Sequence, residues 1–173
     1  VIGTNLTAPS LLVFGSGFTT TVGGNITLTS GSYTLNDSAR ISGARSISVQ
    51  AGNITFGQSG FPYFVVGDSL ATTDTLTLAA SGNINFISNI GGGAEAGTDF
   101  LNALTITTAT NVVFNEEVVV NGSLAINATG TVTFNKGVRL TGGGSLSITG
   151  AAQITFSENS FINLEGGGNL LLE

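Results

Sequence analysis

Ten carboxylate side chains are the principal candidates for chemistry in this chain, because the sequence contains neither histidine nor cysteine. Without histidine the chain lacks the commonest general base and any histidine-based triad, and without cysteine it lacks a thiol nucleophile and a zinc–thiolate site. The acids are scattered along the chain. Glu116 and Glu117 are adjacent, but neighbouring residues of a strand face opposite ways. We therefore expect that the protein is not an enzyme.

A glycine-rich acidic stretch, residues 91–99, is the best candidate for a metal site. Its two carboxylates, Glu95 and Asp99, and its carbonyl oxygens are ligands that a hard cation accepts. The Gly-Gly-x-Gly-x-Asp turn with which some extracellular repeat proteins bind calcium does not occur. We favour a solvated insertion loop and expect neither a metal nor a cofactor. Glu95 and Asp99 remain candidate contacts for a partner.

A second insertion, residues 57–64, brings three aromatic side chains together, among them Phe61 and Tyr63. Loops that project from a regular scaffold are often the places where partners bind. Phe61 and Tyr63 are therefore candidates for contact with a sugar or a neighbouring filament. The alternative, which we favour for most of this set, is that the rings pack inward and close a corner of the fold.

The charge and the hydropathy of the chain exclude two classes of partner. The net charge is −6, with one lysine and three arginines, whereas a nucleic-acid binder needs clustered positive charge. No apolar run reaches the length of a membrane-spanning helix. We expect neither nucleic-acid binding nor a membrane span. Because the chain has no methionine, we expect Val1 to begin a processed chain or a piece of a longer one.

Two short phrases recur along the chain and predict the elements that must position these residues. Both alternate apolar and polar residues, which is the pattern of a β-strand. The first phrase, typified by Asn-Ile-Thr-Phe, has its leading apolar residue at Ile26, Ile54, Ile84, Val112, Val132 and Ile154. The second has it at Ile47, Leu76, Leu104, Leu124, Leu146 and Leu170. Such self-similarity indicates a repeat architecture made of strands, in which equivalent residues stack in columns to form the core.

A third strand fits between the two phrases in each repeat. Its expected copies are residues 33–35, 64–66, 118–120, 138–140 and 162–164. Glycine-rich breaks, such as residues 142–144 and 166–168, supply the corners. The sequence thus predicts an all-β fold, a right-handed parallel β-helix (β-solenoid) with three strands per coil. We expect about six to seven coils of 20–30 residues in a single domain over residues 1–173.

Polar residues of the phrases have a structural interpretation. Asparagine precedes the apolar anchor at Asn25, Asn53, Asn83 and Asn111, and an inward-facing asparagine at a solenoid corner can stack into a ladder. An outward threonine array would suggest ice binding. Asn85 and Val113 interrupt that array, and the coil lengths vary, so we do not favour ice binding.

The phrases over residues 52–56, 122–128 and 144–151 resemble the repeats of filamentous haemagglutinin-like adhesins. These adhesins are exported by two-partner secretion, and the phrases are also similar to those of very large bacterial surface proteins and autotransporter passengers. The resemblance covers nearly the whole chain from about Asn25. It implies an extracellular right-handed parallel β-helix with an adhesive or fibre-forming role, and it carries over no catalytic residues.

Three functions follow as hypotheses. The first is a structural or adhesive segment of an extracellular bacterial fibre or cell-surface adhesin, whose partners are neighbouring coils of the same protein or other copies stacked head to tail. The second is a binding module that presents its insertion loops to a glycan or a host-cell receptor. The third, which we favour least together with ice binding, is a polysaccharide-degrading enzyme, which would need a compact patch of carboxylates.

Overall fold

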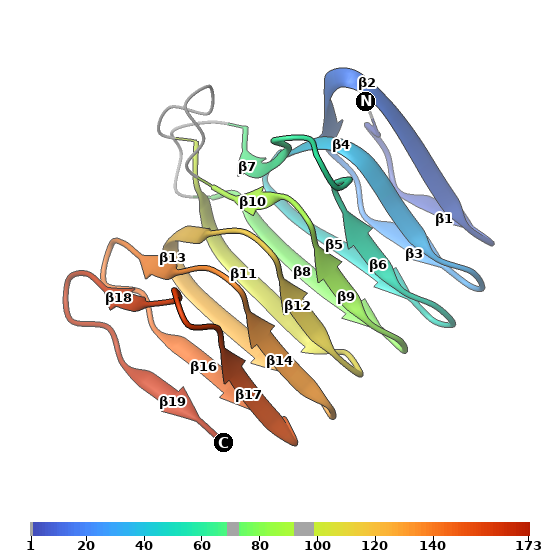
Figure 1. Ribbon diagram of the computed structural model, residues 1–173. Coiled ribbons are helices and arrows are strands. Elements are labelled where there is room, and N and C mark those ends of the chain that lie inside the picture. The colour runs from blue at the N-terminus through green and yellow to red at the C-terminus, as the bar shows by residue number, and fades with distance from the viewer. Residues whose placement is uncertain (1, 69–72, 92–98) are drawn as a thin grey trace.

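The computed structural model describes residues 2–68, 73–91 and 99–173, and these wind into a right-handed parallel β-helix of about seven turns (Figure 1). All the strand pairings are parallel, and the described residues contain no helix. The predicted fold class is confirmed. Because each coil buries its apolar face only against the coils above and below it, the core runs as a continuous strip along the axis.

Three columns of stacked strands form the walls of the solenoid. Column A contains β1 (Leu6–Ala8), β3 (Ile26–Leu28), β5 (Ala44–Val49), β8 (Thr75–Ala80), β11 (Leu101–Thr108), the second half of β13 (Val118–Asn127), β16 (Leu146–Thr149) and β19 (Leu170–Leu172). Column B contains the first parts of β2 (Leu11–Val22) and β4 (Tyr33–Ile41), then β6 (Ile54–Phe56), β9 (Ile84–Phe86), β12 (Val112–Phe114), β14 (Thr131–Phe134) and β17 (Gln153–Phe156). Column C contains the second parts of β2 and β4, β7 (Phe64–Gly67), β10 (Asn89–Ile90), the first half of β13, β15 (Val138–Leu140) and β18 (Ile162–Leu164).

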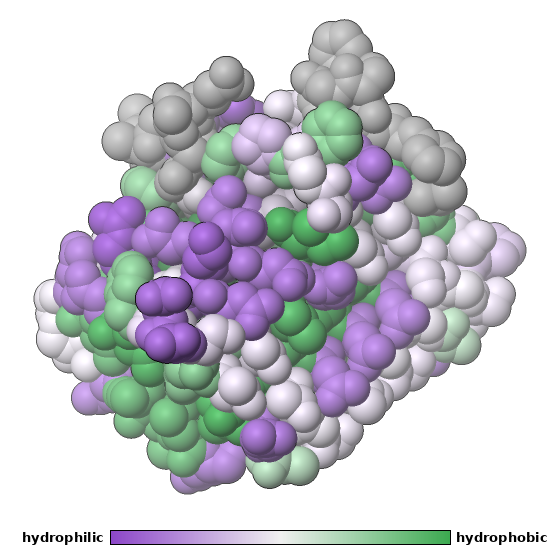
Figure 2. All heavy atoms as spheres, viewed as in Figure 1, coloured by the Kyte–Doolittle hydropathy of each residue, from purple (hydrophilic) through white to green (hydrophobic). Residues whose placement is uncertain are grey.

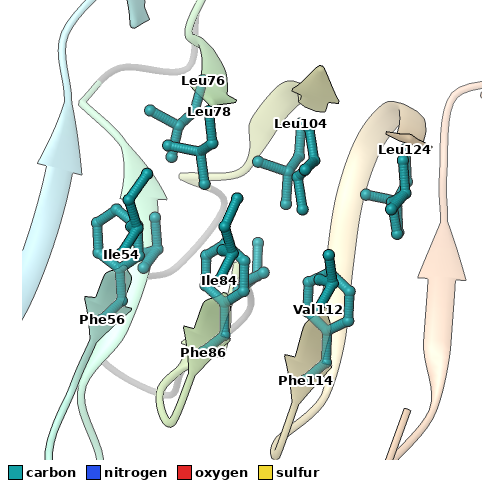
Figure 3. Packing of buried hydrophobic residues seen from close by; sticks show 14 of the residues in the cluster. Ile54, Phe56, Leu76, Leu78, Ile84, Phe86, Leu104, Val112, Phe114 and Leu124 are labelled. Atoms are coloured by element: carbon teal, nitrogen blue, oxygen red, sulfur yellow. The ribbon is translucent and has the colours of Figure 1, made fainter. Parts of the chain in front are cut away.

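A ladder of phenylalanine rings runs through the core along column B (Figure 3). It consists of Phe56, Phe86, Phe114, Phe134 and Phe156, with ring centroids 5.2, 5.0, 4.8 and 5.1 Å apart and the planes nearly parallel. This spacing is close to the distance of roughly 4.8 Å between neighbouring strands. The coil repeat therefore stacks each ring on the next, and leucines of column A face the ladder across the core (Figure 3).

Most of the predicted stacking is confirmed. The anchors Ile54, Ile84, Val112, Val132 and Ile154 pair in register along column B. The predicted third strands at 64–66, 118–120, 138–140 and 162–164 are column C.

Two assignments near the N-terminus are wrong. Ile26 pairs with Ile47, so its phrase belongs to column A and not with Ile54. The position above Ile54 is taken by Tyr33, so residues 33–35 form a column B strand rather than a third strand. The reason is that both columns require the same apolar–polar–apolar pattern, so the phrase alone does not say which wall a strand joins.

The register within column A also differs from the prediction at one step. Ile47 lies opposite Leu78, and Leu76 lies opposite Arg45, so the strands are offset by two residues from the expected alignment. An offset of two preserves the buried face, because side chains alternate with a period of two. The core is the same either way, and the sequence pattern does not distinguish the two registers.

The predicted asparagine ladder exists, but its side chains are mostly exposed rather than inward. The backbone N–H of Asn83 donates to Oδ1 of Asn53 over 2.7 Å, and Nδ2 of Asn111 donates to Oδ1 of Asn83 over 2.8 Å. An inward amide would have to enter an apolar core, where an unpaired polar group costs free energy. From outside, the same side chain bonds to the next coil and leaves its remaining groups in water.

Candidate functional site

A groove lies beside the B–C corner, where the loop at residues 57–62 stands next to column B. It has a volume of about 730 Å³. Its lining comes from three successive coils and consists of Gln58, Ser59, Gly60, Phe61, Pro62, Asn85, Ile87, Asn89, Asn115 and Glu116. Hydrophilic residues form a band across this face of the molecule (Figure 2). The groove lining combines apolar side chains, such as Phe61 and Ile87, with amide side chains, such as Asn85.

The loop that forms one wall is anchored at both ends. It leaves β6 through Gly57, which has φ of +90°, and an added Cβ there would collide with the buried Ser88 hydroxyl. At its other end, the backbone N–H of Asn89 donates to the carbonyl oxygen of Tyr63 over 3.1 Å. The loop is thus attached to the next coil on either side of its exposed tip.

The two aromatic candidates of this loop differ in their exposure. Tyr63 is buried, whereas Phe61 is 53% exposed and lines the groove. Their rings stack with centroids 5.5 Å apart and an angle of 10° between the planes. Tyr63 thus packs inward and supports Phe61 from behind. A partner for Phe61 remains a prediction.

A row of hydrogen-bonded asparagines crosses the groove floor, and it is not among the contacts predicted from the sequence. Nδ2 of Asn115 donates to Oδ1 of Asn85 over 2.8 Å and to the Phe86 carbonyl oxygen over 3.1 Å. Asn135 in turn donates to Oδ1 of Asn115 over 3.2 Å, and the Ser157 hydroxyl donates to Asn135. The recurrence of Phe-Asn at residues 114–115 and 134–135 is the sequence pattern from which this row could be predicted. This row fixes the amides of the floor in defined orientations.

A second hollow of about 520 Å³ adjoins the first on the outer face of column B. It shares Asn85 and Asn115 with the groove, and it also contains Asn83, Asn111, Val113 and Thr131. The hydrogen-bonded amides of Asn85 and Asn115 therefore stand at the boundary between two hollows. Together the hollows form an elongated, amide-lined track along the strand direction.

The groove carries little charge. Among the described residues that line it, Glu116 is the one that is charged, and Nζ of Lys136 lies 3.8 Å from that carboxylate on the surface. Both side chains are substantially exposed, so this pair contributes little to stability.

The other candidate residues lie away from the groove lining. Asp99 forms an ion pair with Arg40, with 3.1 Å between the carboxylate and the guanidinium. This pair connects the last residue of the 91–99 stretch to column C. Glu95 lies outside the described residues, so the candidate cation loop at 91–99 is not tested there.

A buried aspartate organises the neighbouring C–A corner. The carboxylate of Asp74 accepts hydrogen bonds from the backbone N–H of Gly43 over 2.7 Å and of Asp68 over 3.0 Å. Asp74 is only 1% exposed, so these bonds satisfy a carboxylate that would otherwise be costly to bury. The arrangement gives Asp74 a structural role. Within the described residues, no three histidine, cysteine or acidic side chains gather to hold a metal.

Comparisons with known protein families, curated proteins and solved structures find no match to this chain. In the described part of the chain, no helix is long and apolar enough to cross a membrane.

Proposed function

We infer that this β-solenoid is a structural, adhesive segment of an extracellular bacterial fibre or surface adhesin, extended by coil-on-coil stacking. The observation that carries the proposal is the end face formed by β17, β18 and β19. Its inward residues belong to the same rows as the core, but no described coil covers them. They are Ile154, Phe156, Ile162, Leu164, Leu170 and Leu172.

The difference in burial along these rows is large. Leu146 and Ile148 are fully buried, whereas Leu170 and Leu172, their partners in β19, are 48% and 42% exposed. Covering a large apolar side chain contributes roughly 1.5–3 kcal/mol. The apolar residues gather visibly at this end of the rod (Figure 2). A further coil of the same cross-section would bury all of these rows at once.

The strand edges favour the same partner. Among the described strands, β19 pairs with β16 alone, and β17 pairs with β14 alone. An open strand edge presents backbone donors and acceptors to any strand that can continue the ladder. A further coil, from the same polypeptide or from another copy, satisfies these groups and buries the apolar rows together.

The resemblance to secreted adhesins supports an extracellular location. The phrases over residues 52–56, 122–128 and 144–151 resemble those of secreted adhesins. Labelling of intact source cells with an antibody against the chain tests the location, and an absence of surface signal would contradict it.

Sedimentation velocity and electron microscopy of the 173-residue chain test the stacking. We expect concentration-dependent rods, and we expect the double variant Leu170→Lys/Leu172→Lys to remove them. The matched control is Leu171→Lys. Leu171 lies in the same strand and pairs with Ser147, but its side chain is on the other face of the strand. A chain that stays monomeric at high concentration would overturn stacking between copies and leave only a further coil of the same polypeptide. So would a control variant that disrupts assembly as strongly as the double variant.

A further inference from the structure

We propose that the groove beside the 57–62 loop, with the adjoining hollow on column B, binds a neutral oligosaccharide. The argument begins with Phe61. A phenylalanine that is 53% exposed and lines a concave surface offers an apolar face to a ligand. Pyranose rings present apolar C–H faces of comparable width. Phe61, with Pro62 and Ile87 beside it, is the stacking surface of the proposed site.

The Phe61 ring is pre-organised for such stacking. It lies against the buried Tyr63 ring with 5.5 Å between centroids, and Tyr63 accepts a backbone hydrogen bond from Asn89 at its carbonyl oxygen. A side chain that is already held by its neighbours loses little conformational freedom when a ligand binds. The loop therefore presents a fixed ring.

The amides of the floor and wall match the hydroxyl groups of a sugar. An amide side chain offers both donors and acceptors, and a sugar hydroxyl also does both. Among the described residues, none accepts a hydrogen bond from Nδ2 of Asn85, and none bonds to the side chains of Asn89 or Gln58. These groups remain available to a ligand. The Asn85 side chain is held in place because its Oδ1 accepts a hydrogen bond from Nδ2 of Asn115.

Charge distinguishes a neutral sugar from an acidic one. Glu116, a carboxylate, is the single charged residue among the described ones that line the groove, and the nearby Lys136 is already paired with it. An acidic polysaccharide would meet an anion without a compensating cluster of cations. A neutral chain meets a carboxylate that accepts hydrogen bonds from hydroxyl groups.

The shape of the track favours a chain of sugars over a peptide. Two hollows of about 730 and 520 Å³ share Asn85 and Asn115, so an occupant that fills both is longer than one ring. A peptide bound in extended form usually adds to an open sheet edge. That mode is blocked here, because β9 already pairs with β6 on one side and β12 on the other.

Isothermal titration calorimetry with defined tetrasaccharides tests the proposal. The probes are the neutral tetramers of β-1,4-linked glucose, β-1,4-linked N-acetylglucosamine, α-1,4-linked glucose and β-1,4-linked mannose, with the acidic tetramer of galacturonate as a comparison. We expect at least one neutral probe to bind, and to bind more tightly than the acidic one. Failure of all four neutral probes, or preference for the acidic probe, would overturn the proposal.

Matched variants locate the binding. Phe61→Ala should weaken the bound probe about tenfold, whereas Phe161→Ala, which removes another half-exposed ring on a distant coil, should change the affinity less than about twofold. Asn89→Ala should weaken binding about fivefold and Asn159→Ala should have no effect. Circular dichroism verifies that each variant is folded. Equal losses of affinity in a groove variant and its control would show that the probe does not bind in this groove. The groove lies away from the end face, so this outcome is independent of the stacking experiment.

Discussion

Two regions of the solenoid build the same core from coils of different length. One comprises the coils between Ile54 and Val112, and the other comprises the coils that follow Val112. Column B anchors are 20 and 22 residues apart from Val112 to Val132 and on to Ile154, but 30 and 28 residues apart from Ile54 to Ile84 and on to Val112. Both regions bury the same rows and the same phenylalanine ladder. The extra residues therefore enter loops and not the core.

The three corners differ in how much chain they accept. The A–B corner varies little, with residues 50–53 before β6, 81–83 before β9 and 128–130 before β14. The B–C corner ranges from residues 57–63 after β6 to residues 87–88 after β9. The asparagine ladder and its backbone bonds restrict the first corner, whereas the second opens to solvent and builds the groove.

The largest expected effect tests whether both regions share one core. Phe114 is 1% exposed and lies between Phe86 and Phe134 in the ladder, where the two regions meet. Phe114→Ala should lower the free energy of unfolding by about 3–5 kcal/mol, because it removes buried surface and leaves a cavity. Urea denaturation measures the change. A loss below about 1 kcal/mol would show that the coils on either side are stabilised independently.

Paired insertions test the difference between the corners. Four Gly-Ser residues inserted after Thr129 should cost about 2–3 kcal/mol, because they disrupt the bonds from Gly130 N–H to the Thr110 carbonyl and from Thr131 N–H to Asn111 Oδ1. The same insertion after Gly60 only lengthens an exposed loop and should cost about 0.6 kcal/mol. Thermal or urea unfolding measures both. Equal costs would contradict the view that the A–B corner is restricted.

A glycine row at the C–A corner of the short coils should be nearly as sensitive. A Cβ on Gly144 would collide with the carbonyl oxygen of Gly122 in the preceding coil, and one on Gly168 would collide with that of Gly144. Gly144→Ala should therefore cost about 2 kcal/mol by forcing the coils apart. As a control, Gly167→Ala meets no atom within 4 Å and carries only the strain of its φ of +90°, about 1 kcal/mol. A smaller loss at Gly144 than at Gly167 would exclude close coil contact as the cause.

The smallest expected effect is a gain in stability. The Tyr33 hydroxyl, at the column B position before the insertions, is buried and finds no hydrogen-bond partner among the described residues. Tyr33→Phe should raise the free energy of unfolding by about 1 kcal/mol. The Phe134→Leu variant, which alters an apolar ring without touching a buried polar group, should lower it.

The same residue predicts a pH dependence. Burial raises the pKa of the Tyr33 phenol above its usual value of 10.0. Below pH 10 the phenol is neutral in both the folded and the unfolded chain, so it adds no pH dependence. Above pH 10 the phenol of the unfolded chain loses its proton while that of the folded chain keeps it. The free energy of unfolding therefore falls as the pH rises. The slope of stability against pH above about pH 10 should be smaller in Tyr33→Phe. Identical slopes would show that Tyr33 ionises freely in the folded state.

The sequence by itself determined the class of fold. Alternation such as Ile54-Thr55-Phe56 assigns one face of each strand to the core, and its recurrence requires that equivalent coils stack. The phrase does not determine the neighbours of each strand. Ile26 and Ile54 carry nearly the same phrase but join different walls, and Ile47 pairs two residues away from its expected partner.

Only the tertiary structure decided where the groove lies. Phe61 and Asn115 are far apart in sequence and contribute to one surface because the solenoid brings successive coils close together. Likewise, the difference between the buried Tyr63 and the exposed Phe61 depends on the coil that follows them. A period of two specifies which way a side chain faces. The lengths of all the corners between two strands decide which coil lies beside a given side chain. Those corner lengths become clear only in the folded chain.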